Sequence, residues 1–145
     1  MKRIEGACHC GRIRYCLQSR RAPGEFKLRE CDCGYCVRFR GNYASDPEGE
    51  LGIVVSGPVT PYRHGTKTAE FYVCATCGIM PVAVSRIEGR DYAVVNARCA
   101  EAFVPYLASA RLMSFGSEST EQRLARRIRS WICMVTIDRH GSAAG

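Results

Sequence analysis

The sequence predicts a mainly β domain that binds metal through cysteine-rich turns and carries one helix near its C-terminus. Two observations support this fold class: short segments alternate apolar and polar residues between turn residues, and ten cysteines occur among 145 residues. The length corresponds to about one domain of ~100–200 residues, so we treat residues 1–145 as a single domain. The 46% hydrophobic and 24% charged fractions exclude a wholly disordered chain.

Six short segments have the alternation or the β-branched content that is typical of strands. They cover residues 12–17, 26–29, 53–55, 70–73, 81–84 and 92–97. Turn residues separate these segments, at Pro23-Gly24, 46–49, Gly57-Pro58 and Glu88-Gly89. Short strands at this spacing predict mainly antiparallel sheets of six or more strands.

One helix is predicted over about residues 119–132, where Ser119 and Gln122 fit a capping box. An apolar stripe at helical spacing predicts the face that packs on the core, formed by Leu124, Ile128, Trp131 and Ile132. The arginines of this segment fall elsewhere around the helix, at Arg123, Arg126, Arg127 and Arg129. We expect them to form a solvated outer face rather than a nucleic-acid surface. The last residues, 141–145, have the composition of a flexible tail.

The N-terminal residues lead into Cys8 without the apolar segment of a secretory signal, and no run approaches the ~18 apolar residues of a membrane span. We therefore expect a cytoplasmic protein without membrane association, whose thiols stay reduced. Seven of the ten cysteines are clustered, as Cys8-x-Cys10, Cys31-x-Cys33-x-x-Cys36 and Cys74-x-x-Cys77. Such close spacing favours metal ligands over disulfides.

A glycine follows or lies within each cluster, at Gly11, Gly34 and Gly78. Glycine can take the positive φ that turns backbone amides toward thiolate sulfurs, as a zinc knuckle requires. We therefore expect a knuckle at each of the three clusters.

Seven clustered cysteines divide naturally into a closed zinc site with four ligands and an open site with three. In this partition, the first zinc is held by Cys8, Cys10, Cys74 and Cys77, and it joins distant segments. The second is held by Cys31, Cys33 and Cys36, which leave a position for water, a thiol or substrate. The competing possibility is a closed second site completed by Cys99. Cys16 and Cys133 are expected to be packed or free thiols.

Three motifs in order, Gly6-x-Cys8-x-Cys10-Gly11, Cys31-x-Cys33-x-x-Cys36 and Cys74-x-x-Cys77-Gly78, resemble the glutathione-dependent formaldehyde-activating enzyme family, which includes centromere protein V. The resemblance covers about residues 5–100. It implies a β-tent fold of antiparallel sheets, a structural zinc on the four-cysteine group and a catalytic-type zinc on the triplet. It also implies condensation of formaldehyde with glutathione, formally a carbon–sulfur lyase reaction in reverse. Asp32 stands where the family usually has histidine, and the stretch from about Met113 onward shows no likeness to the family.

The expected partners are a small thiol such as glutathione and a small aldehyde. Glutathione carries two carboxylates, and Arg38, Arg40 and Arg63 are candidates to bind them by paired hydrogen bonds. His9 and His64 are expected at the surface rather than in a catalytic role. The formal charge is +7, and residues 1–40 hold ten Lys and Arg against four Asp and Glu. The alternative function is a zinc-stabilised binding module or scaffold that meets nucleic acid through this basic surface, although we expect no specific nucleic-acid binding.

Overall fold

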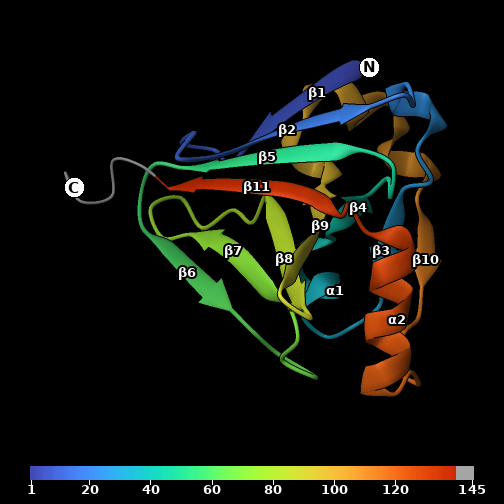
Figure 1. Cartoon of the computed structure of the whole chain (residues 1–145). Helices are drawn as coiled ribbons and strands as arrows, with labels where there is room; N and C mark the ends of the chain where they lie inside the picture. The colour runs from blue at the N-terminus through green and yellow to red at the C-terminus, as the bar shows by residue number, and fades with distance from the viewer. Residues whose placement is uncertain (140–145) are drawn as a thin grey trace.

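The computed structural model describes residues 1–139, which form eleven strands in two sheets. Figure 1 shows the four-stranded sheet lying across the top of the seven-stranded sheet, with helix α2 standing along one side. The tail predicted at residues 141–145 lies outside the described residues.

The four-stranded sheet has the order β1-β2-β5-β11. Its strands are β1 (Lys2–Ala7), β2 (Ile13–Ser19), β5 (Glu50–Val55) and β11 (Met134–Arg139). Strands β1 and β2 form an antiparallel hairpin that places Ala7 opposite Arg14, and the chain between them holds the first cysteine pair. Strand β11 pairs in parallel with β5.

The seven-stranded sheet has the order β10-β3-β4-β9-β8-β7-β6. Its strands are β3 (Arg29–Cys31), β4 (Asn42–Ala44), β6 (Val59–Tyr62), β7 (Glu70–Cys74), β8 (Val82–Ile87), β9 (Arg90–Asn96) and β10 (Arg111–Met113). Two α-helices accompany the sheets, α1 (Cys36–Phe39) and α2 (Thr120–Ser130). Short 3-10 helices cover Pro23–Glu25, Ala97–Cys99 and Glu101–Ser109. Both remaining cysteine clusters belong to this sheet, since β3 ends at Cys31 and β7 ends at Cys74.

The prediction of a mainly β fold is confirmed, but the sheets are mixed rather than purely antiparallel. The two parallel pairs are β10 with β3 and β11 with β5. In each pair, a strand from the C-terminal part of the chain lies beside a strand from the N-terminal part. Neither was predicted: β10 has three residues, and most side chains of β11 are exposed. The segment predicted at 26–29 buries Phe26 and Leu28, as its alternation requires, but the strand begins only at Arg29.

The main core lies between the two sheets, where the inward side chains of both form one hydrophobic cluster. In β2, Ile13, Tyr15 and Leu17 are 0–2% exposed, and the intervening residues face outward. The Tyr15 hydroxyl donates to the carbonyl of Asn96, at 3.0 Å, across to the second sheet. Each buried aliphatic side chain contributes about 1.5–3 kcal/mol, so alternation of this kind fixes which face of β2 turns inward.

Helix α2 begins as its sequence predicts. The Ser119 hydroxyl accepts from the Gln122 amide at 3.1 Å, and the Gln122 side-chain oxygen accepts from the Ser119 amide at 2.9 Å. This confirms the capping box, which satisfies two backbone donors at the helix start. The helix ends at Ser130, so Trp131 and Ile132 lie beyond it.

The predicted apolar stripe is confirmed in part: Trp131 and Ile132 are buried, and Leu124 packs against the core. Ile128, expected in the core, is 42% exposed, whereas Arg127 is only 5% exposed. The expected solvated arginine face is therefore incorrect for Arg123, Arg126 and Arg127, which line an internal pocket together with the side chain of Trp131. The arginines can turn inward because polar groups receive them: Glu118 accepts from Arg126, and the hydroxyls of Thr68 and Ser85 accept from Arg127.

Candidate metal centre

The first cysteine group joins the two sheets at a single point. The Sγ atoms of Cys8, Cys10, Cys74 and Cys77 lie within 4.8 Å of one another. The Cys8–Cys10 and Cys10–Cys74 sulfur distances are 3.7 and 3.5 Å. A tetrahedral zinc with Zn–S bonds of about 2.3 Å needs sulfur–sulfur distances of about 3.8 Å, so this donor set fits one zinc ion.

Two backbone turns, each of which ends at a glycine, present these four sulfurs. The Gly11 amide donates to the Cys8 carbonyl, and the Gly78 amide donates to the Cys74 carbonyl. Gly11 and Gly78 have φ of 81° and 82°, the left-handed conformation expected of a knuckle. The predicted knuckles are confirmed at these two clusters.

The backbone and Arg12 favour the ionised thiolate of Cys10, whereas burial raises the pKa of Cys8 to about 11. The Ile13 amide donates to the Cys8 sulfur at 3.3 Å. Hydrogen bonds from the backbone and then the side chain of Arg12 lower the pKa of Cys10 to about 6. A zinc ligand must be deprotonated, so these donors prepare the site for a cation.

The second group is built from one short stretch of chain. Cys31 ends β3, Cys33 lies in the following turn and Cys36 begins α1, and their three sulfurs also lie within 4.8 Å of one another. The Cys36 amide donates to the Cys33 sulfur at 3.3 Å. Hydrogen bonding with the Cys36 thiol lowers the pKa of Cys31 to about 6. The Cys36 thiol in turn lies 3.2 Å from the Tyr43 hydroxyl, which fixes its orientation.

The turn at this second group differs from the predicted knuckle. Gly34 does not take a positive φ; instead the chain continues into α1, and Arg40 ends that helix with φ of 55°. A helical turn after Cys33 brings the Cys36 amide back to the Cys33 sulfur. This turn therefore directs a backbone amide at a sulfur without a glycine of positive φ.

The described residues supply three ligands at the second group, not four. Cys99, the candidate for a fourth, lies elsewhere: burial, followed by the charges of Cys8 and Cys77, raises the pKa of its thiol to about 12. It is therefore a neighbour of the four-cysteine group. Three sulfurs are consistent with a metal ion that keeps one position open. The prediction of metal binding is confirmed in part: two cysteine groups could each hold a metal ion, and their donor atoms suit zinc.

The three-cysteine group faces a pocket of about 130 Å³. Its walls combine the sulfurs with an apolar side formed by Phe71, Ala83 and Val94 and a cationic side formed by arginines. The arginines that line it are Arg29, Arg123, Arg126 and Arg127. Asp32 also lines it and is exposed.

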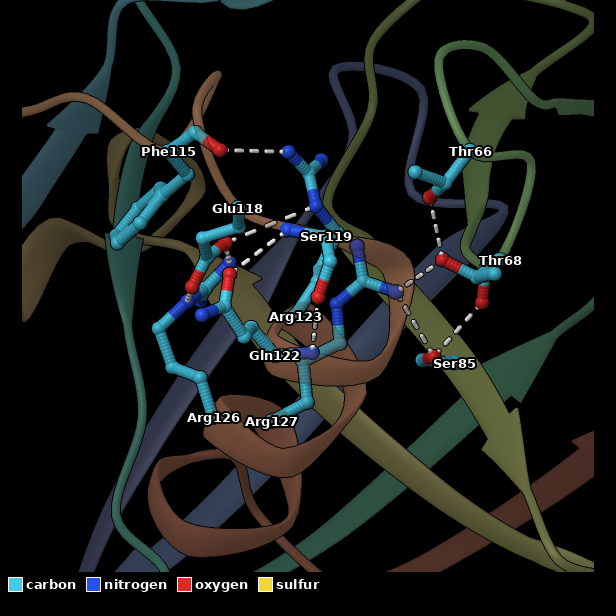
Figure 2. A network of polar contacts seen from close by, with 10 residues as sticks. All are labelled: Thr66, Thr68, Ser85, Phe115, Glu118, Ser119, Gln122, Arg123, Arg126 and Arg127. Atoms are coloured by element: carbon cyan, nitrogen blue, oxygen red, sulfur yellow. Dashed lines mark hydrogen bonds and ion pairs between the residues drawn. The ribbon is translucent and has the colours of Figure 1, made fainter.

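The cationic side is held in place by a polar network (Figure 2). Glu118 accepts two hydrogen bonds from Arg126, at 2.8 and 3.0 Å, and pairs with Arg123 at 3.7 Å. Arg127 donates to the hydroxyls of Thr68 and Ser85, at 2.7 and 3.1 Å. The helix arginines are therefore fixed from both sides of the pocket.

The arginines proposed from sequence as carboxylate contacts are not brought to this pocket. Within residues 1–139, none of Arg38, Arg40 and Arg63 lines it. Arg38 donates to the Gly34 carbonyl, and Arg40 and Arg63 pair with Glu30 and Glu70. Proximity to Cys36 along the chain suggested Arg38 and Arg40, and loop placement suggested Arg63. The pocket is instead lined by arginines of α2, which were expected to face solvent.

His64 lines the pocket and is partly buried, contrary to the surface position expected for it. Its ring stacks on Phe71 with centroids 5.1 Å apart, and it contacts Tyr35 and Tyr62. Burial lowers the pKa of His64, and the charges of Arg123 and Arg127 lower it further, so the ring is neutral near pH 7. His9, by contrast, is exposed as expected. No local sequence signal marks His64, because only the fold brings its loop to the triplet.

Comparison with known proteins adds a fold but no family. No family model matches the chain. A crystal structure of a Rhodobacter sphaeroides protein superposes with a TM-score of 0.58 at 27% identity, over 75% of this chain and 99% of that one. Among residues 1–139, no helix has the length and apolar character needed to cross a membrane.

Proposed function

We propose that the protein is a metal-dependent enzyme of the carbon–sulfur lyase type. In this proposal it joins a low-molecular-weight thiol such as glutathione to a small aldehyde such as formaldehyde. The observation that carries the proposal is the convergence of three sulfurs, from Cys31, Cys33 and Cys36, on the wall of a pocket. Three protein ligands are the number found in catalytic zinc sites, which keep a fourth position for water or substrate. The resemblance of the cysteine motifs to the formaldehyde-activating family points to the same chemistry.

The reaction balances without an oxidant or a reductant. The thiol loses its proton, the C–S bond forms, and the carbonyl oxygen ends as a hydroxyl that carries a proton. A zinc ion bound by the three cysteines would lower the pKa of the substrate thiol and polarise the carbonyl group.

The chain's own residues supply orientation, charge and a proton acceptor. Tyr43 holds Cys36, and the apolar wall restricts water in the pocket. His64 is neutral near pH 7, and its Nε2 is buried without a hydrogen-bond partner, so it can accept the thiol proton. The arginines place positive charge where negative charge develops on the carbonyl oxygen.

Exchange spectroscopy by NMR tests the proposal at equilibrium, with formaldehyde and glutathione present. The two reactants also combine without a protein, so the wild type must exchange them faster than a protein-free sample. Cys33→Ser should abolish the excess rate, whereas Cys133→Ser should retain it, because Cys133 belongs to neither cysteine group. Equal rates with wild type, Cys33→Ser and no protein would contradict an enzyme and favour the zinc-stabilised scaffold.

A further inference from the structure

The pocket contains an unusual concentration of unsatisfied nitrogen atoms. In the part of the chain that the structure describes, five buried side-chain atoms lack a hydrogen-bond partner. Four of them belong to residues that line this pocket: His64 Nε2, Arg123 Nε, Arg127 Nε and Trp131 Nε1. Three of the four are obligatory donors, because neither guanidinium nor indole nitrogen can accept. Of these three, Arg123 Nε has an ion pair with Glu118 at 3.7 Å, which is longer than a hydrogen bond.

Burial makes these unused donors costly. Arg127 and Trp131 are only 5% and 7% exposed, and the Arg127 guanidinium lies 4.8 Å from the centre of the Trp131 ring. A buried donor without a partner costs about 1–3 kcal/mol. Folded proteins tolerate few such atoms, and three donors beside one pocket indicate a ligand that presents acceptor oxygens to them.

The charges around the pocket indicate that this ligand is an anion. Arg126 and Arg123 share the carboxylate of Glu118. Within residues 1–139, Arg127 and Arg29 instead hydrogen-bond only to hydroxyl groups, those of Thr68, Ser85 and Ser45. Figure 2 shows Arg123 and Arg126 beside Glu118, and Arg127 directed to the hydroxyls of Thr68 and Ser85.

A count of charges indicates a monoanion. The four arginines and the carboxylates of Glu118 and Asp32 together leave a charge of +2. Three thiolates around one divalent cation would contribute −1. One carboxylate would therefore bring the pocket to neutrality.

The size of the pocket restricts the ligand further. A cavity of about 150 Å³ holds benzene, so the 130 Å³ present here encloses a molecule of about six non-hydrogen atoms. Glutathione, with about twenty, cannot be enclosed in such a volume. The three cysteines and the arginines line the same small pocket, so a molecule of this size can contact both.

We propose that Arg123, Arg127 and Trp131 bind the carboxylate of a small monocarboxylic acid whose other end reaches the three-cysteine group. This ligand class rests on the proposed function for its reacting group: the acid carries either an aldehyde, as glyoxylate does, or a thiol, as 3-mercaptopropionate does. The carboxylate site itself rests only on the donors, charge and volume of the pocket.

Trp131 is the only tryptophan in the chain, so its fluorescence reports binding without any need for turnover. The titrants are glyoxylate and 3-mercaptopropionate, their uncharged counterparts acetaldehyde and 2-mercaptoethanol, and inorganic phosphate. We expect at least one of the two acids to give a saturable change and to bind about tenfold or more tightly than its uncharged counterpart, as one charge-assisted hydrogen bond predicts. Which acid binds more tightly identifies the carrier of the carboxylate.

Arg127→Lys and Arg123→Gln should each weaken binding of the acid about tenfold. Arg129→Gln should leave it unchanged, because Arg129 is exposed on the same helix and does not line the pocket. Circular dichroism checks folding, and Arg123→Gln decides the question if the buried Arg127 does not tolerate substitution. Three results would overturn the site: uncharged titrants that bind equally well, phosphate that binds more tightly than both acids, or affinity that neither pocket variant alters.

The fluorescence titration tests the carboxylate site, and the exchange assay tests the proposed function, so a negative result in one does not imply a negative result in the other. Saturable, arginine-dependent binding of an acid with no exchange above background would keep the carboxylate site and contradict the proposed function. Exchange above background without arginine-dependent binding would support the proposed function and contradict the carboxylate site.

Discussion

Cys74→Ser should remove the connection between the two sheets and with it the folded state. Cys74 is 0% exposed, and its sulfur lies 3.5 Å from that of Cys10, which is 64 residues away in the chain. Structural zinc contributes about 10–16 kcal/mol of apparent binding free energy in small zinc domains, whereas the net stability of a domain is about 5–15 kcal/mol. Loss of even a third of the zinc-binding free energy, about 3–5 kcal/mol, would therefore remove much of the net stability of the domain.

The assay is soluble expression followed by thermal melting with circular dichroism. We expect Cys74→Ser to be insoluble or to melt far below the wild type, and a strong chelator to lower the wild-type melting temperature toward it. Cys16→Ser is the matched control, because Cys16 lies on β2 outside both cysteine groups and its change should cost less than about 1 kcal/mol. A soluble Cys74→Ser protein that melts at the wild-type temperature would refute the reasoning.

Three further predictions concern the frame around the site. Phe103 is 0% exposed, so Phe103→Ala should lower the free energy of unfolding by about 3–5 kcal/mol in a urea titration. A Cβ at Gly6 would lie 2.3 Å from the Tyr15 ring, and Gly6→Ala should therefore cost about 1–3 kcal/mol in the same titration. Arg126 lowers the pKa of Glu118 through their hydrogen bonds. The resulting stability is complete above the unfolded-state pKa of about 4.3 and is lost as the pH falls through the lower folded-state value. The stability difference between wild type and Glu118→Gln, measured by urea unfolding at each pH, should accordingly be largest near pH 7 and shrink toward pH 3; a pH-independent difference would contradict it.

The parts of the structure that follow from local rules could be predicted. The two knuckles depend on Gly11 and Gly78 alone, since cysteine spacing and positive φ are properties of a few consecutive residues. The alternation in β2 and the cap at Ser119 are equally local. These signals were sufficient for the mainly β class and for both cysteine groups.

The parts that depend on distant segments could not be predicted. Strand β11 forms because β5 offers a free edge to it, and its largely exposed side chains carry no burial pattern that would mark it in the sequence. Helix α2 has one apolar and one basic side, and hydrophobicity alone assigned the basic side to solvent. Its true orientation follows from the hydroxyls of Thr68 and Ser85, which receive Arg127 from segments 59 and 42 residues away.

The central claim is that one chain holds two metal ions in two separate cysteine groups. Native mass spectrometry of protein expressed with added zinc tests it most directly, because it counts the ions on each folded chain. The account predicts two zinc ions on the wild type, two on Cys16→Ser and one on Cys33→Ser, with the Cys33→Ser protein still folded because its four-cysteine group is intact. An unchanged count of zinc in Cys33→Ser would contradict the claim.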